Sequence, residues 1–493
     1  MVALGGAVLM ALAFPKTNAT GLAPLGAAAL YWAWFGLSPK RAFLVGWAAG
    51  SVFFAINYAW FGETAGALIA PFGEFLTLGP GVGDALFGFA LPAFAAAHLQ
   101  QRAPGPLVPL GAAAIFAFAE WFRCEGLGVL GVPFGSLGYS QVDSPFAPLG
   151  AYVGTYGITF AIALLGAYAA YALRAPFALA RLLQAGIAFG AVVAAVALAW
   201  FTWPAKAPAP PDFKVAAVQG NIPQSLKFTG AAYQKALARY TSLTLGLRGT
   251  HVKLVVWPET VIVRALNLDG PLQARFGAIA KAIGAELVVG TFEVLNQTQQ
   301  YNTLFFFRPD GGLDSVYQKR QLVPFAEHLP LRPYLTWIPW AREVNNIGTG
   351  DTPGIVEANG MHIGPIICWE SAFSGLNVDD VQHGAQAFAI STDDAWFGTT
   401  AGPYMHAQIA QMRAIETGRW IVRAAATGIS GIVAPNGRYT QRSDLEVTTV
   451  VIGAIGAPVA TAYDAIGPIP VALGCLAIYG GIFAWPARPR VRR

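Results

Sequence analysis

The first 203 residues constrain the fold most, because they form a nearly unbroken series of apolar segments separated by short loops. A helix needs about 20 apolar residues to cross a bilayer. Only 12% of the chain is charged, well below the roughly 25% of an ordinary soluble domain. We predict a polytopic α-helical membrane domain of eight spans, near residues 3–14, 20–37, 42–62, 82–100, 107–124, 155–173, 180–202 and 467–486. The first segment is short, but a cleaved signal peptide is the weaker interpretation because no basic residue precedes it.

Basic residues in the loops predict how these spans are oriented, because short loops rich in Lys and Arg stay in the cytoplasm. If eight spans alternate in direction, one side of the membrane receives most of the basic loop residues: Lys40, Arg41, Arg102, Arg174, Arg181, Arg488, Arg490, Arg492 and Arg493. The other side receives most of the acids, with Lys16 and Arg123 as exceptions. We therefore expect both termini in the cytoplasm and residues 204–466 on the opposite side, in the periplasm or its equivalent.

A proline-rich segment divides the chain. The sequence PAKAPAPP at 204–211 cannot continue the preceding helix, and it predicts a stiff linker over residues 204–212. Beyond the linker, short β-branched runs alternate with helical stretches, which is typical of an α/β domain with buried strands. We expect strands at 215–218, 254–256, 287–289, 303–307, 363–367 and 387–390, and helices at 231–247, 272–283 and 407–417. The predicted domains are a membrane domain at 1–203, an α/β domain at 213–455, and a final span with a basic cytoplasmic tail at 456–493.

Composition argues against several classes of ligand. The net charge is only +5, and no basic run with interleaved aromatics indicates a nucleic-acid surface. The three cysteines, Cys124, Cys368 and Cys475, include no C-x-x-C pair, so neither a disulfide framework nor a thiolate zinc site is indicated. The six histidines lack ligand spacing, and no glycine-rich phosphate loop precedes a helix. We expect no metal, no cofactor and no nucleic acid.

Three residues of the α/β domain stand in positions suited to chemistry. Glu259 follows the strand at 254–256 beside an indole, a setting that could raise the pKa of a general base. Lys319 lies eight residues before Glu327 and could stabilise an oxyanion. Cys368 ends a predicted strand at a strand-to-helix turn, which would expose its thiol. Taken singly, each has a simpler interpretation: a solvated strand-end acid, a surface lysine and a buried structural cysteine.

Taken together, the glutamate, lysine and cysteine in this order resemble the nitrilase superfamily. Further motifs of the α/β half are similar to those of the apolipoprotein N-acyltransferase family, at 218–224, 301–303, 322–327, 394–398 and 413–416. The membrane half agrees, with matching segments at 14–15, 120–123 and the glycine-rich 133–141. The resemblance therefore covers essentially the whole chain. It departs from the family pattern at Asp393, Trp420 and Thr427, where Asn, Pro and Asn are usual, and we expect local loop differences there.

This resemblance implies a nitrilase-like αββα sandwich and a ping-pong reaction through a thioester. Cys368 would attack an acyl ester of a membrane phospholipid, and Glu259 would take the thiol proton and return it. Lys319 and the backbone N–H of Trp369 would hold the oxyanion. The acceptor would be the α-amino group of the diacylglyceryl-cysteine that begins an apolipoprotein. Such an enzyme is embedded in the bacterial inner membrane, and we expect a monomer.

The resemblance also implies supporting residues around the triad. Glu327 would orient Lys319 or the base, and Trp369 and Glu370 would shape the pocket. Phe228 falls where family members carry an aromatic on a mobile arm, although an ordinary core aromatic is an equal alternative.

Two other functions stay open at this point. One is a membrane-tethered amidase of the nitrilase type, in which water resolves the thioester. The other is a transporter or binding protein with an inactive nitrilase fold. Eight spans exceed what a tether needs, which favours transfer over hydrolysis. Charge pairs at span centres would favour the transporter, yet the predicted spans are almost free of charge apart from Glu120 at a helix end.

Overall fold

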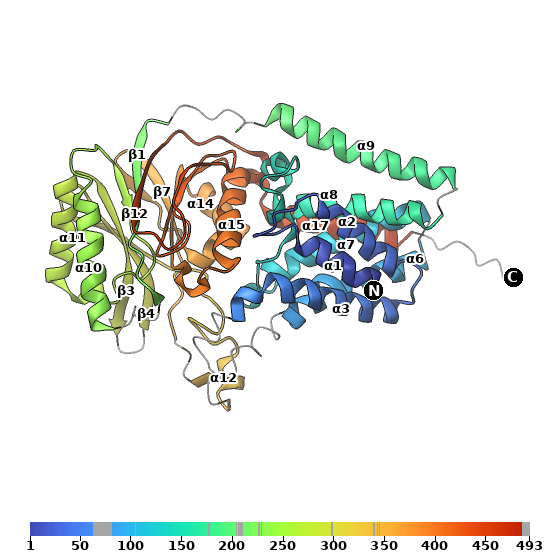
Figure 1. Cartoon of the computed structure of the whole chain (residues 1–493), viewed down its shortest axis with the longest axis horizontal. Helices are drawn as coiled ribbons and strands as arrows, with labels where there is room; N and C mark the ends of the chain where they lie inside the picture. Colours follow the sequence, from blue (N-terminus) through green and yellow to red (C-terminus); the bar gives the residue numbers. More distant parts are fainter. Residues whose placement is uncertain are drawn as a thin grey trace. The chain divides into compact units, whose positions relative to one another are not determined.

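The computed structural model describes most of the chain, in the ranges 1–62, 81–103, 105–175, 178–203, 205, 211–224, 227, 229–296, 299–338, 341–342, 344 and 346–485. The chain divides into two compact units. One comprises Met1–Trp203 with Ala465–Arg493, and the other comprises Pro204–Asp464. Figure 1 colours both units along the sequence.

The first unit is helical. Its main helices are α1 (Val2–Ala11), α2 (Leu22–Trp34), α3 (Pro39–Asn57), α6 (Leu91–Gln100), α7 (Val108–Trp121), α8 (Gly150–Leu173), α9 (Leu179–Thr202) and α17 (Pro468–Phe483). Small residues allow close packing, because a Cβ on Gly26 of α2 would lie 2.6 Å from the carbonyl oxygen of Gly6 in α1. In contrast, α9 exposes large apolar side chains such as Ile187 and Phe201. An apolar helix face left exposed is typical of contact with lipid.

Four helical stretches among the described residues are long and apolar enough to cross a membrane: Gly81–Gln100, Gly105–Gly126, Ala147–Leu173 and Leu179–Thr202. They correspond to four of the eight predicted spans. Val2–Ala11 and Pro468–Phe483 are apolar but shorter helices, and the segments predicted at 20–37 and 42–62 contain α2 and α3. The membrane character of this unit is supported, while the full set of eight spans stays a prediction.

A buried polar network holds the glycine-rich segment of the helical unit. The guanidinium of Arg123 forms an ion pair with Asp84 at 3.0 Å and donates to the carbonyl oxygens of Val132 and Phe134. Tyr58 donates to the same Asp84 carboxylate at 2.5 Å. These buried charges were not expected from the sequence. Because two partners of Arg123 are backbone carbonyls, the network fixes the local backbone.

The second unit contains two six-stranded sheets. The first has the strand order β12 (Thr449–Ile455), β1 (Phe213–Gln219), β2 (Leu254–Val256), β3 (Glu286–Asn296), β4 (Gln299–Phe307) and β5 (Leu313–Gln318). The second has the order β11 (Tyr439–Arg442), β10 (Gly431–Val433), β9 (Trp420–Ala425), β8 (Ala387–Thr392), β7 (Met361–Ile367) and β6 (Val356–Ala358). Neighbouring pairs within β1–β2–β3 and within β7–β8–β9 are parallel.

The two sheets pack face to face, with helices on their outer faces, as Figure 1 shows. Residues of both sheets share one core, including Val215, Val256, Ala389 and Val422. The outer face of the first sheet packs against α10 (Gly230–Leu245) and α11 (Gly270–Ile283). The second sheet is covered by α14 (Ser374–Gln382) and α15 (Gly402–Thr417). Central strands are buried on both faces because each lies between a helix layer and the opposite sheet. The predicted αββα sandwich is therefore confirmed.

A buried carboxyl group at the start of β3 predicts a pH-dependent stability. Glu286 is 1% exposed, and its Oε1 has no hydrogen-bond partner among the described residues. Burial, with a smaller contribution from the negative charge of Asp314, raises the pKa of Glu286 to about 7. Because the folded state then binds this proton more tightly than the unfolded state, the stabilisation is complete below the ordinary glutamate pKa and is lost as the pH rises through about 7.

The free energy of unfolding of the wild type should therefore fall between weakly acidic and weakly alkaline pH. We expect this fall to be smaller by about 1 kcal/mol in Glu286→Gln. Thermal unfolding of the detergent-solubilised protein across this range measures the effect. Glu357→Gln is the matched control, because Glu357 is exposed on β6. Identical pH dependence in the wild type and in Glu286→Gln would contradict the prediction.

Candidate active site

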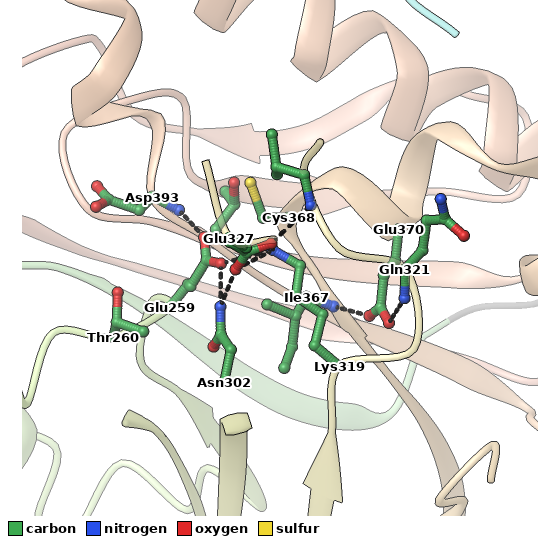
Figure 2. A network of polar contacts seen from close by, with 12 residues as sticks. Glu259, Thr260, Asn302, Lys319, Gln321, Glu327, Ile367, Cys368, Glu370 and Asp393 are labelled. Atoms are coloured by element: carbon green, nitrogen blue, oxygen red, sulfur yellow. Dashed lines mark hydrogen bonds and ion pairs between the residues drawn. The ribbon is translucent and has the colours of Figure 1, made fainter. Parts of the chain in front are cut away.

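Four chemically important residues follow strands of the two sheets. Glu259 lies three residues after β2, Lys319 directly follows β5, Cys368 directly follows β7, and Asp393 directly follows β8. Each therefore lies at the carboxyl end of its strand, where an α/β sheet commonly presents functional side chains. Figure 2 shows these residues gathered into one network, together with Glu327.

Both carboxylate oxygens of Glu259 are held by hydrogen bonds. Oε1 accepts from Nζ of Lys319 at 3.0 Å and from Nδ2 of Asn302 at 2.7 Å. Oε2 accepts from the backbone N–H of Asp393 at 3.0 Å. These three donors fix the orientation of a side chain that is only 7% exposed.

The pKa of Glu259 is lowered from its ordinary value. Burial alone would raise it, but the ammonium groups of Lys319 and Lys227 and the hydrogen bonds from Lys319 and Asn302 outweigh burial. The expectation of a raised pKa, made from the indole beside Glu259, is therefore wrong. Two buried cations that lie far from it in sequence decide the sign. Glu259 is thus a carboxylate at neutral pH.

Lys319 lies between two carboxylates. Its Nζ is 3.0 Å from Oε1 of Glu259 and 2.9 Å from Oε2 of Glu327, and the side chain is 1% exposed. Burial opposes the charged form, yet the negative charges of Glu259 and Glu327 keep the pKa of Lys319 above its ordinary value. Glu327 is itself fixed, because it accepts from the backbone N–H of Val323 at 2.8 Å and from Asn302 at 2.8 Å. The arrangement provides one permanent, oriented cation.

Cys368 lies at a strained turn from β7 into the short helix Cys368–Ala372. Its φ is 51°, a left-handed conformation that a non-glycine residue seldom adopts. Its side chain faces the same network, and the residue is 8% exposed. Burial and the negative charge of Glu259 raise the pKa of the Cys368 thiol well above its ordinary value, against the opposing effect of Lys319. The resting group is therefore a neutral thiol that needs a base to react.

A second buried network supports this turn from behind. Nε2 of His406 lies 3.2 Å from the carbonyl oxygen of Cys368, while its Nδ1 lies 2.9 Å from Oδ1 of Asp394. Arg423 donates to the other oxygen of Asp394 at 2.8 Å. Although burial opposes ionisation, Arg423 and His406 hold the pKa of Asp394 well below its ordinary value. These contacts fix the backbone that carries the thiol.

Glu370 joins the ends of two strands from different sheets. Its Oε2 accepts from the backbone N–H of Ile367 at 2.6 Å. Its Oε1 accepts from the backbone N–H of Gln321 at 3.2 Å and from the hydroxyl of Tyr317 at 2.9 Å. Glu370 thus fixes the segments that carry Lys319 and Cys368. Trp369 is also buried and packs near Phe373, with ring centroids 6.2 Å apart.

Sequence reasoning assigned no role in this site to Asn302, Asp393 or Lys227, which the structure places around Glu259. Asn302 was noted only as part of a motif, although it bridges Glu259 and Glu327. Asp393 was expected to affect a local loop, yet it contacts Glu259 and forms an ion pair with Lys227. Phe228, the predicted arm aromatic, lies outside the described residues. Among the described residues, no group of three or more His, Cys, Asp and Glu side chains is arranged to hold a metal ion.

Comparisons with known proteins match both units of the chain. Residues 6–168 match the family model of the apolipoprotein N-acyltransferase N-terminal domain, and residues 214–464 match that of carbon-nitrogen hydrolases. An apolipoprotein N-acyltransferase from Azotobacter vinelandii is 33% identical, over 90% of this chain and 86% of the relative. One from Pseudomonas syringae is 32% identical, over 97% of this chain and 95% of the relative. Among solved structures, an amidase from Nesterenkonia sp. is 17% identical with a TM-score of 0.40, over 51% of this chain and 92% of that chain.

Proposed function

Because the chain belongs to the apolipoprotein N-acyltransferase family, we propose that it moves a fatty acyl chain from a membrane phospholipid onto the N-terminal amine of a lipoprotein. The acceptor is the α-amino group of a diacylglyceryl-cysteine. One observation carries this proposal: Glu259, Lys319 and Cys368 meet at one buried site in a chain that also has helices apolar enough for a membrane.

In the first half of the reaction, Glu259 accepts the proton of the Cys368 thiol as the sulfur attacks the ester carbonyl of the phospholipid. The negative charge that forms on the carbonyl oxygen is stabilised by the Lys319 ammonium, with the backbone N–H of Trp369 as a second donor. Glu259 then returns its proton to the departing lysophospholipid oxygen. The acyl chain stays on Cys368 as a thioester.

In the second half, the acceptor amine attacks the thioester carbonyl. Glu259 takes a proton from the attacking nitrogen, and the Cys368 sulfur leaves and recovers a proton as a thiol. The products are an amide on the acceptor and the free enzyme, which gives ping-pong kinetics. A carboxylate that is ionised at rest and a thiol that is protonated at rest suit this order of steps.

The membrane unit gives the catalytic unit access to its donor. Transferring a phospholipid acyl chain into water costs about 0.8 kcal/mol for each methylene, so the chain should be taken up from the bilayer directly. We place the protein in the bacterial inner membrane with eight spans, the catalytic unit on the periplasmic side and both termini in the cytoplasm. We expect it to act as a monomer without a cofactor.

Two rivals differ in testable ways. An amidase of the same superfamily would resolve the thioester with water and leave a free fatty acid. A transporter with an inactive nitrilase fold would need no assembled site and would form no thioester. The buried pair of Arg123 and Asp84 does not favour the transporter. Arg123 also binds the carbonyl oxygens of Val132 and Phe134, so the pair fixes the local backbone.

The test uses the purified protein in vesicles of dipalmitoyl phosphatidylethanolamine with a synthetic diacylglyceryl-cysteine peptide. We expect the peptide to gain one palmitoyl group as an amide, detected by mass spectrometry. The same peptide with an acetylated amino terminus is the control and should gain none. Release of palmitate with an unmodified peptide would instead establish hydrolysis and contradict transfer.

A further inference from the structure

A buried ion pair lies beside Glu259, and one of its members contacts Oε2 of Glu259, whereas Lys319 contacts Oε1. Nζ of Lys227 binds Oδ2 of Asp393, and the two side chains are 8% and 1% exposed. Lys227 belongs to the chain between β1 and α10, whereas Asp393 directly follows β8. The same two residues line a small cavity of about 10 Å³, room for one water molecule at most. Both side chains are therefore largely shielded from bulk solvent.

The pair holds Glu259 from two directions. The backbone N–H of Asp393 donates to Oε2 of Glu259 at 3.0 Å. Lys227 donates to Oγ1 of Thr260 at 2.6 Å, and its Nζ lies 3.5 Å from the carbonyl oxygen of Glu259. Thr260 has a φ of 44°, which is strained for a β-branched residue. Lys227 thus contacts the backbone carbonyl of Glu259 and the side chain of Thr260. It also binds Asp393, whose backbone N–H donates to the Glu259 carboxylate.

The charges around Glu259 come from several elements. Lys319 follows β5 and Glu327 lies in the loop beyond it, Cys368 follows β7, and the Lys227–Asp393 pair completes the set. Behind Cys368, Asp394 is compensated by Arg423 and His406. Glu259, Glu327 and Asp393 are therefore three carboxylates facing two ammonium groups. Removal of Lys227 would leave Asp393 as an uncompensated buried carboxylate close to Glu259.

We propose that Lys227 and Asp393 form a positioning pair, in which Lys227 neutralises Asp393 and keeps Glu259 ionised and aimed at Cys368. The proposal rests on the proposed function only in taking Glu259 as the base for Cys368. Neither Lys227 nor Asp393 needs to touch a substrate. Both act through Glu259, whose pKa is lowered in part by the charge of Lys227.

The test follows alkylation of Cys368 by iodoacetamide as a function of pH, read by mass spectrometry of the peptide that carries this residue. In the wild type, the acidic limb of this profile should report ionisation of Glu259, and Glu259→Gln should abolish the limb. Lys227→Met should move the limb upward by about 1 pH unit or more, because a carboxylate loses a nearby cation. The double variant Lys227→Met/Asp393→Asn should bring the limb back to within about 0.3 pH unit of the wild type, since both charges are then removed.

Lys235→Met is the matched control, because Lys235 is exposed on α10. It should leave the limb in place. An unmoved limb in a folded Lys227→Met variant would overturn the proposal, as would a double variant shifted as far as the single one. If Lys227→Met alone does not fold, recovery of folding in the double variant supports the charge pair and continued misfolding contradicts it. Alkylation requires no acyl donor, so this test does not depend on acyl transfer. If the protein formed no acyl adduct, the proposed function would be contradicted, but the alkylation profiles would still decide whether Lys227 and Asp393 position Glu259.

Discussion

A Cys368→Ala variant is expected to lose transfer to the lipopeptide by about 10⁴-fold or more, because the proposed reaction holds the acyl chain on this thiol between its two halves. The measurement is the initial rate of N-acylation of the diacylglyceryl-cysteine peptide. Alanine also suits the site structurally, since the φ of 51° strains alanine about as much as cysteine. Loss of activity therefore should not come from altered backbone strain.

Cys475→Ala provides the matched control for Cys368→Ala. Cys475 is a buried free thiol in α17 of the helical unit, outside the proposed site. We expect this variant to keep the wild-type rate within about twofold, as is usual for a modest change away from an active site. A Cys368→Ala protein that is folded and still transfers the acyl chain would refute the role of this thiol.

Lys319→Met is expected to reduce the rate by about 10³-fold, because it removes the cation that would stabilise the oxyanion. It should also destabilise the protein by about 3–5 kcal/mol, because Glu259 and Glu327 would share a buried region without their common partner. The rate is measured with the lipopeptide assay and the stability by thermal unfolding in detergent.

The double variant Lys319→Met/Glu327→Gln separates these two effects. Removing the charge of Glu327 should recover much of the lost stability, because only one unpaired carboxylate then remains. Activity should stay as low as in the single variant, since no cation has been restored. Recovery of both stability and activity in the double variant would mean that Lys319 serves only the fold.

Several elements of the α/β unit were predictable because their residues are buried on both faces. The apolar runs at 215–218, 254–256 and 387–390 lie within β1, β2 and β8. Six strands were not predicted: β5, β6, β10 and β12, and also β9 and β11, which show the physical reason most clearly. Strand β9 contains Arg423, which is buried only because Asp394 neutralises it, and β11 is largely exposed and polar. The local pattern of apolar residues does not reveal a strand whose buried polar side chain is neutralised by a residue far away in the sequence.

The three central residues of the site were predictable, because their order along the chain and the motifs around them are typical of one kind of catalytic site. Glu259, Lys319 and Cys368 were named from their motifs, and the structure brings them together. The ion pair of Lys227 with Asp393 was not predictable, because the two residues lie 166 positions apart and meet only when the two sheets pack. The pKa of Glu259 is lowered by Lys319 and Lys227, so the direction of its shift could not be deduced from the residues next to Glu259.

The acyl-enzyme itself is the most direct evidence for acyl transfer through Cys368. The purified protein is incubated with dipalmitoyl phosphatidylethanolamine without acceptor, quenched, and analysed by mass spectrometry of its proteolytic peptides. We predict a palmitoyl group on Cys368 that neutral hydroxylamine removes and that Cys368→Ala lacks. An adduct on another residue, one that resists hydroxylamine, or no adduct at all on a folded wild-type protein would contradict acyl transfer through Cys368.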